Sequence, residues 1–64
     1  MTIRLDPSVN FVSERTVLFS GSYHGPVAHV RDDHERGLVG IRFFQGIVGE
    51  PRDHIYLVPR RCVV

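Results

Sequence analysis

Short runs of alternating apolar and polar residues cover most of the chain. The clearest run spans residues 38–44, where Val39, Ile41 and Phe43 share one face. Side chains of a β-strand alternate between its two faces in this way. No segment repeats with the 3.6-residue period of an amphipathic helix, so helix is a minor component. Further strands are predicted at 3–5, 16–19, 27–31 and 54–58.

Turn-forming residues separate these strands. Asp6-Pro7-Ser8 predicts a turn, since proline presets the backbone and the Asp and Ser side chains bond to it. Glycine and proline predict a loop at 20–26 and a long hairpin loop at 45–53. The polar turn at 32–37 ends at Gly37, which tolerates a positive φ. Five short strands with such turns predict an all-β barrel, because closure removes exposed strand edges.

Two neighbouring strands of this barrel are predicted to carry a contact face. If Ile41, Phe43, Ile55 and Leu57 fill the interior, the alternate side chains point outward. Aromatic residues and arginine are enriched at protein interfaces. The candidate partner-binding residues are Arg42, Phe44, His54 and Tyr56, with Tyr23 and His24 from the 20–26 loop and Arg60 and Arg61 near the end. In the alternative interpretation, Phe44 closes one end of the barrel and Tyr56 packs under the 45–53 loop.

The size of the chain indicates one domain, residues 1–64. A chain this short buries only about 60% of its unfolded surface, and such domains often gain stability by pairing with a second copy or a partner. Eight arginines and seven acidic residues leave a net charge of +1. This balance provides no general attraction to nucleic acid.

Reactive side chains are few. Cys62 is the single cysteine, so no internal disulfide forms, and a packed thiol in a reducing, cytoplasmic compartment is expected. No apolar run reaches the length of a membrane helix. The polar stretch from His29 to His34, with Asp32 and Asp33, is either a metal-binding candidate or a solvated turn; we expect the turn. No cofactor, metal or catalytic arrangement is predicted.

The end of the chain carries a resemblance to a known architecture. Val58-Pro59-Arg60-Arg61-Cys62-Val63, an apolar residue and proline followed by a turn and a short apolar stub, resembles the closing segment of SH3-like barrels. This ending and the order of the elements after Thr16 make the chain similar to SH3-like and Tudor-like barrels. The resemblance implies a five-stranded barrel with a short 3-10 turn before the last strand. The chain has no tryptophan, and Cys62 replaces an expected tyrosine, so binding of proline-rich peptides is not expected.

The resulting functional hypothesis is a small non-enzymatic binding module, a regulatory or accessory factor whose partner is another protein. One alternative is a nucleic-acid-binding or transcription-associated barrel, because Val17-Leu18-Phe19 with His24-Gly25 is similar to Tudor-like modules of bacterial transcription regulators. The other is a minimal oligomeric enzyme. There Ile55-Tyr56 resembles part of the pore motif of the plasmid-borne dihydrofolate reductase, with His54 in place of a glutamine.

Overall fold

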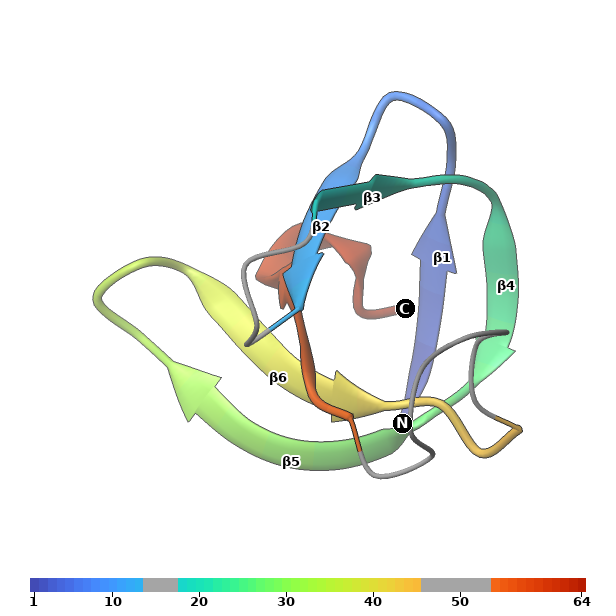
Figure 1. Cartoon of the computed structure of the whole chain (residues 1–64). Helices are drawn as coiled ribbons and strands as arrows, with labels where there is room; N and C mark the ends of the chain where they lie inside the picture. Colours follow the sequence, from blue (N-terminus) through green and yellow to red (C-terminus); the bar gives the residue numbers. More distant parts are fainter. Residues whose placement is uncertain (14–17, 46–53) are drawn as a thin grey trace.

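The computed structural model describes residues 1–13, 18–45 and 54–64. All of its longer elements are strands, so the all-β prediction is confirmed. The elements are β1 (Thr2–Leu5), β2 (Asn10–Ser13), β3 (Leu18–Ser20), β4 (Tyr23–Pro26), β5 (Ala28–Asp33), β6 (Leu38–Arg42), β7 (Tyr56–Pro59) and the 3-10 turn η1 (Arg60–Cys62) (Figure 1). β4 occupies the segment predicted to be a loop, and β2 precedes the strand predicted at 16–19. Most of the predicted 45–53 loop lies outside the described residues.

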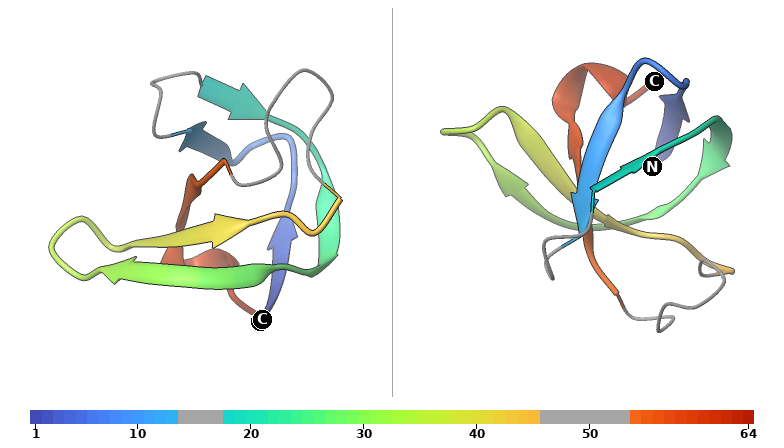
Figure 2. Two further views of the ribbon diagram at one scale, coloured as in Figure 1. Left: turned by 60° about the horizontal axis from the view of Figure 1, so that its bottom comes forward. Right: turned by 45° about the horizontal axis from the view of Figure 1, so that its top comes forward.

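The strands form two antiparallel sheets rather than the single closed barrel that was expected. β1 pairs with β4, and the larger sheet has the order β3-β2-β7-β6-β5. No closed barrel is present among the described strands, although the two sheets surround a common interior (Figures 1 and 2). The chain passes from one sheet to the other at Val27, whose buried side chain and N–H bond to the Met1 carbonyl (2.8 Å) hold the crossing in place.

Two turns follow from local side-chain chemistry. At the predicted turn after β1, the Ser8 N–H donates to Asp6 Oδ1 (2.8 Å) and the Val9 N–H donates to the Asp6 carbonyl (2.9 Å). This is the side-chain-assisted turn that aspartate favours. In the turn between β5 and β6, Gly37 has a φ of 67°. Gly37, which was expected to tolerate a positive φ, adopts one, and other residues are strained in this region.

β7 is the central strand of the larger sheet, with β2 on one side and β6 on the other. Directly opposite residues of an antiparallel pair share a face. Tyr56 lies opposite Ile41, and Val58 lies opposite Val39. Ile41 and Val39 are fully buried in the core cluster, and Tyr56 and Val58 belong to that same cluster.

The predicted orientation of this strand is therefore wrong. His54 and Tyr56 were expected on the surface, but they are only 6% and 1% exposed. Leu57, expected inside the barrel, lies opposite Gly40 on the other face of the sheet, and Ile55 is half-buried. The reason is that 55–58 is an unbroken apolar run, and alternation cannot identify the inner face of a strand that is covered on both sides.

The C-terminal segment joins the two sheets. β7 ends at Pro59, and the predicted 3-10 turn is present as η1. The Arg60 N–H donates to the Gly37 carbonyl (2.9 Å), which ties η1 to the β5–β6 turn. Val63 then forms a bridge with Ile3 of β1, and the Val64 N–H donates to the Thr2 carbonyl (2.9 Å). The two ends of the chain are thereby linked beside β1 (Figure 1).

Candidate functional site

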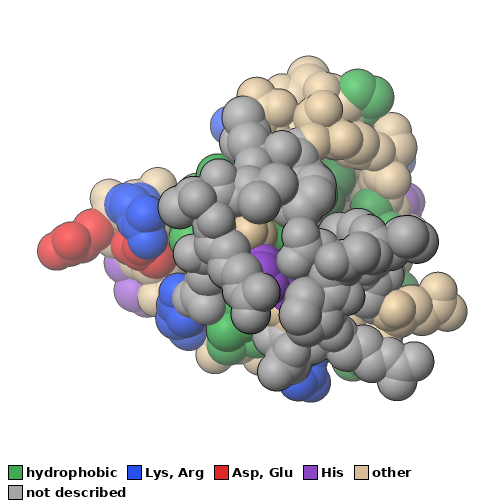
Figure 3. Space-filling view, viewed as in Figure 1, with side chains coloured by type: hydrophobic (Ala, Val, Ile, Leu, Met, Phe, Trp, Pro, Cys, Tyr) green, Lys and Arg blue, Asp and Glu red, His purple; other side chains and the backbone are tan. Residues whose placement is uncertain are grey.

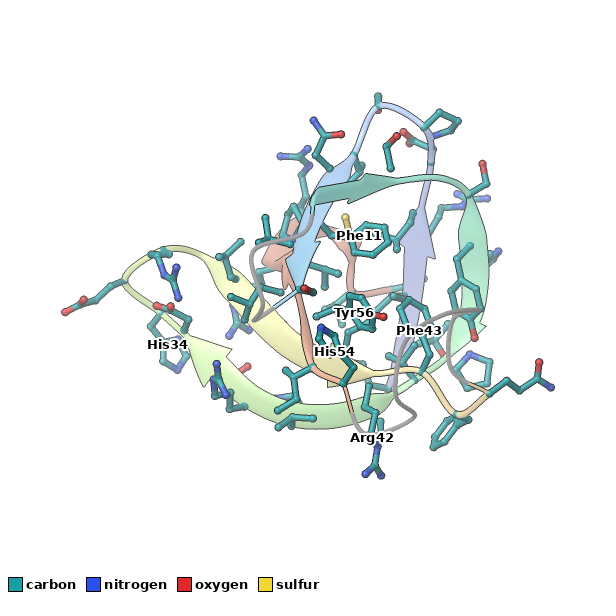
Figure 4. All side chains as sticks on the ribbon, in the orientation of Figure 1. Phe11, His34, Arg42, Phe43, His54 and Tyr56 are labelled. Carbon is teal, nitrogen blue, oxygen red and sulfur yellow. The ribbon has the colours of Figure 1, made fainter. Side chains whose placement is uncertain are left out.

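Aromatic rings fill the interior between the sheets. The Phe11 ring meets the Phe43 ring at a centroid distance of 6.4 Å and the Tyr56 ring at 5.8 Å, and Phe43 and Tyr56 are 5.4 Å apart. The His54 ring lies 5.0 Å from that of Tyr56 (Figure 4). Tilted and edge-to-face contacts of this kind are favoured by the ring quadrupoles. Strands β2 and β7, together with residues just after β6 and just before β7, thus contribute to one aromatic cluster.

Tyr23 carries this cluster to the surface. It is half-buried at the start of β4, opposite Leu5 of β1, and its ring meets Phe43 edge-on at 5.0 Å and 84°. Its hydroxyl donates to the Pro26 carbonyl (2.7 Å). The ring covers Gly25, where an added Cβ would lie 3.1 Å from the Tyr23 oxygen. Because both ends of the side chain are held, its ring forms a fixed wall.

A cavity of about 430 Å³ opens beside this wall. Its size is within the range of about 300–1,000 Å³ that is typical of ligand pockets. Phe44 at its edge is 58% exposed, and none of the described lining side chains is charged. We call this space the aromatic cavity; it is lined by Leu5, Phe11, Gly21, Ser22, Tyr23, Pro26, Phe43, Phe44 and Gln45.

A second cavity, of about 520 Å³, adjoins the first. We call it the polar cavity; it is lined by Arg4, Leu5, Asp6, Ser22, Tyr23 and His24. Arg4 and His24 are exposed and lie directly opposite each other in the β1–β4 pair, so they share a face. Hydrogen bonds from the Ser8 hydroxyl and N–H, and then the charges of Arg61 and Arg4, lower the pKa of Asp6.

The structure brings together three of the predicted contact residues. Tyr23 and Phe44 line the aromatic cavity, and His24 lines the polar cavity. Arg42 is exposed on β6 and points away from the interior (Figure 4). His54 and Tyr56 are buried, as described above. Arg60 and Arg61 are exposed on η1 and contribute to neither cavity.

Charged groups gather instead at the far end of the β5–β6 hairpin (Figure 3). Asp32 Oδ1 accepts from Arg60 Nη2 (3.0 Å) and contacts His29 Nε2 (3.2 Å), and Asp33 pairs with Arg36. These hydrogen bonds and charges lower the pKa of both aspartates. In the described ranges, no three His, Cys, Asp or Glu side chains converge as metal ligands. Residues 32–37 are exposed or half-buried, as expected of a solvated turn.

Cys62 is buried at the end of η1, and its burial raises the pKa of the thiol. At neutral pH the side chain is therefore the protonated thiol, which is a poor nucleophile. The expectation of a packed thiol is consistent with its place in the core cluster.

The sequence pattern did not identify several residues of the aromatic cavity. Leu5 and Phe11 have ordinary strand patterns, and only the register of β1 with β4 places Leu5 beside Tyr23. The sequence offered one signal for this cavity: residues 20–26 are mostly small, turn-forming residues, and such residues leave room for a cavity beside the aromatic Tyr23.

Comparisons with known proteins identify no relative of this chain. No family model matches the chain, and searches of curated proteins and of solved structures give no match. Of the segments that the structure describes, none forms a helix with the length and apolarity to cross a bilayer.

Proposed function

We propose that this chain is a non-enzymatic binding module that recognises another protein through the aromatic cavity. The observation that supports this most is the combination of an open cavity, whose described walls carry no charge, and an exposed aromatic ring, Phe44, at its edge. Buried aromatic anchors that enter such pockets dominate many protein interfaces. Tyr23, fixed by its bond to Pro26, provides a wall that needs little ordering on binding.

The distribution of aromatic rings favours a protein partner over nucleic acid. Single strands bind where several exposed rings stack on successive bases along a basic groove. Among the side chains that the structure describes, Phe44 is the only Phe or Tyr ring that is largely exposed. The charged hairpin end is also mixed in sign, since Asp32 and Asp33 neutralise Arg60 and Arg36.

The reductase-like alternative required His54 and Tyr56 at the surface of a symmetric pore. Both side chains are buried in the protomer. That arrangement therefore has no support in this fold.

We also propose that the fold is a variant of the SH3-like and Tudor-like architecture. The support is the strand–proline–turn ending, with β7 closing at Pro59, η1 following, and Val63 reaching Ile3 of β1. The split into two sheets distinguishes it from a closed barrel.

The proposed function can be tested by selecting peptides from a random displayed library against the purified chain. We expect a common motif to be enriched. We expect Phe44→Ser to abolish this enrichment, because it removes the ring at the edge of the cavity. The matched control is Val30→Ser, which removes an exposed apolar side chain (41% exposed) from β5, outside both cavities.

Equal enrichment on the Phe44→Ser variant would mean that binding occurs elsewhere. Absence of any enriched motif on the parent chain would contradict a peptide-recognising module. Circular dichroism of both variants verifies that the sheets are intact.

A further inference from the structure

We propose that the aromatic and polar cavities together bind an extended segment of the partner in which an aromatic side chain lies next to acidic residues. This inference rests on the proposed function and specifies the chemistry of the ligand. The aromatic side chain enters the aromatic cavity, and a neighbouring carboxylate meets Arg4 and His24. Each part of the proposal rests on a different set of contacts.

The aromatic cavity selects an uncharged ring. Its walls include Phe11, Tyr23 and Phe43, and among the described residues no Arg, Lys, Asp, Glu or His side chain lines it. A charge that entered would lose water and find no ion pair among the described lining residues, which is strongly unfavourable. A ring gains edge-to-face contacts with walls that already pack in this geometry, as Tyr23 and Phe43 do at 84°.

The polar cavity selects a negative group. Arg4 carries a permanent charge, and its guanidinium is suited to a carboxylate. His24, opposite Arg4 across the β1–β4 pair, offers a second nitrogen. Asp6 is the acidic group in this cavity, and its Oδ1 accepts hydrogen bonds from the Ser8 N–H and hydroxyl.

Asp6 does not cancel the positive charge around this cavity. Arg4 lines the cavity, and Arg61, which lies outside it, also acts electrostatically on the Asp6 carboxylate, so two arginines act on this one acidic group. Among the described residues, the charges around Asp6 therefore favour an incoming anion.

The two cavities are close enough for one short segment. They share Leu5, Ser22 and Tyr23, so the ring site and the charged site adjoin each other. In an extended chain, every second side chain points to the same side, with a rise of about 3.3 Å per residue. A ring and a carboxylate on nearby residues of one strand can therefore occupy both cavities together.

The test uses a property of this chain, which contains no tryptophan. Selective excitation of tryptophan therefore reports only on an added peptide. The probe is a blocked peptide whose single tryptophan has two glutamates on each side, and matched peptides carry glutamine or lysine instead. We expect saturable binding with a blue shift for the glutamate peptide, binding roughly two- to fivefold weaker for glutamine, and the weakest binding for lysine.

Two variants separate the cavities. Arg4→Gln should abolish the difference between the glutamate and glutamine peptides while the blue shift persists. Gly21→Leu should weaken all three, since an added Cβ at this lining residue meets nothing within 4 Å and the larger side chain occupies the opening. If Gly21→Leu fails to fold, Phe44→Ser replaces it.

Other results overturn the proposal. Equal affinity for the three peptides would exclude the carboxylate site, and N-acetyltryptophanamide binding as tightly as the peptides would indicate a small-molecule site. A dimeric mass in sedimentation that returns to monomer in Phe44→Ser would mean that a second copy fills the cavity. If none of the peptides binds while library enrichment still requires Phe44, the ligand class is wrong and the proposed function stands. If enrichment is absent as well, both fail.

Discussion

The aromatic interior and the charged end of the β5–β6 hairpin are held together by different forces. In the interior, Phe11, Phe43 and Tyr56 are almost fully buried and touch one another. At the hairpin end, the Asp32 and Arg60 side chains are about one third and one half exposed. Burial of apolar area is the main stabilising term in folding, whereas exposed ion pairs are screened by water and salt.

The comparison explains where a recognition site can form in so small a protein. The interior is apolar enough for an aromatic wall to extend from the core to the surface through Tyr23. The outer strand β5 instead has a register shift between His29 and Arg31 and a charged end, features that discourage pairing with another strand. The cavity side is suited to binding, and the hairpin side is suited to remaining solvated.

Substitution in the interior should have the largest effect. Tyr56→Ala removes the ring that contacts Phe11, Phe43 and His54, and we expect a loss of about 3–5 kcal/mol in the free energy of unfolding. For a marginally stable domain this approaches global unfolding. Urea denaturation followed by circular dichroism measures it, with the exposed Arg42→Ala as control. Similar stability of the two variants would contradict the assignment of Tyr56 to the core.

A matched pair of glycine variants should give an intermediate effect at the hairpin end. An added Cβ meets nothing within 4 Å at either Gly37 or Gly21, but only Gly37 has a positive φ, 67°. We therefore expect Gly37→Ala to destabilise the fold by about 1–2 kcal/mol, and Gly21→Ala to be neutral or slightly stabilising. Thermal unfolding of both variants tests this. Equal effects would show that the backbone conformation of the hairpin turn does not matter.

The smallest effect is expected for the ion pairs of Asp32. The hydrogen bond from His29, and then the charges of His29 and Arg60, lower its pKa below the usual 3.8. The stability from this group is present above that value and is lost as the pH falls through the lowered pKa. Between pH 7 and pH 3, the melting temperature of Asp32→Asn should therefore fall less than that of the parent chain.

High salt should reduce this difference at neutral pH, because it screens exposed charges. Identical pH profiles would mean that the Asp32 contacts contribute nothing to folding. If Asp32→Asn lost more free energy of unfolding than Tyr56→Ala, the charged hairpin end would contribute more to stability than the aromatic interior, contrary to this comparison.

The candidate site could be predicted only in part. Phe44 was identified by strand alternation and Tyr23 and His24 as loop residues beside the same face, because aromatic residues and arginine are enriched at interfaces, and all three line the two cavities. His54 and Tyr56 were placed on the wrong side. Tyr56 lies in the unbroken apolar run 55–58 and His54 directly precedes it, so the pattern contains no information about which face is inside.

Local chemistry along the chain was sufficient for the all-β class, the Asp6 turn and the positive φ of Gly37, whereas the 3-10 turn was expected from the resemblance of the C-terminal segment to SH3-like barrels. Each of the first three depends on a few adjacent residues, whose conformational preferences act before any distant contact forms. Only the tertiary structure decided that β1 pairs with β4, that β7 lies at the centre of its sheet, and that Leu5 and Phe11 meet Tyr23 and Phe44 around a cavity. Strand order and register depend on contacts between residues far apart in the chain, and these are set by how all the apolar faces are buried together.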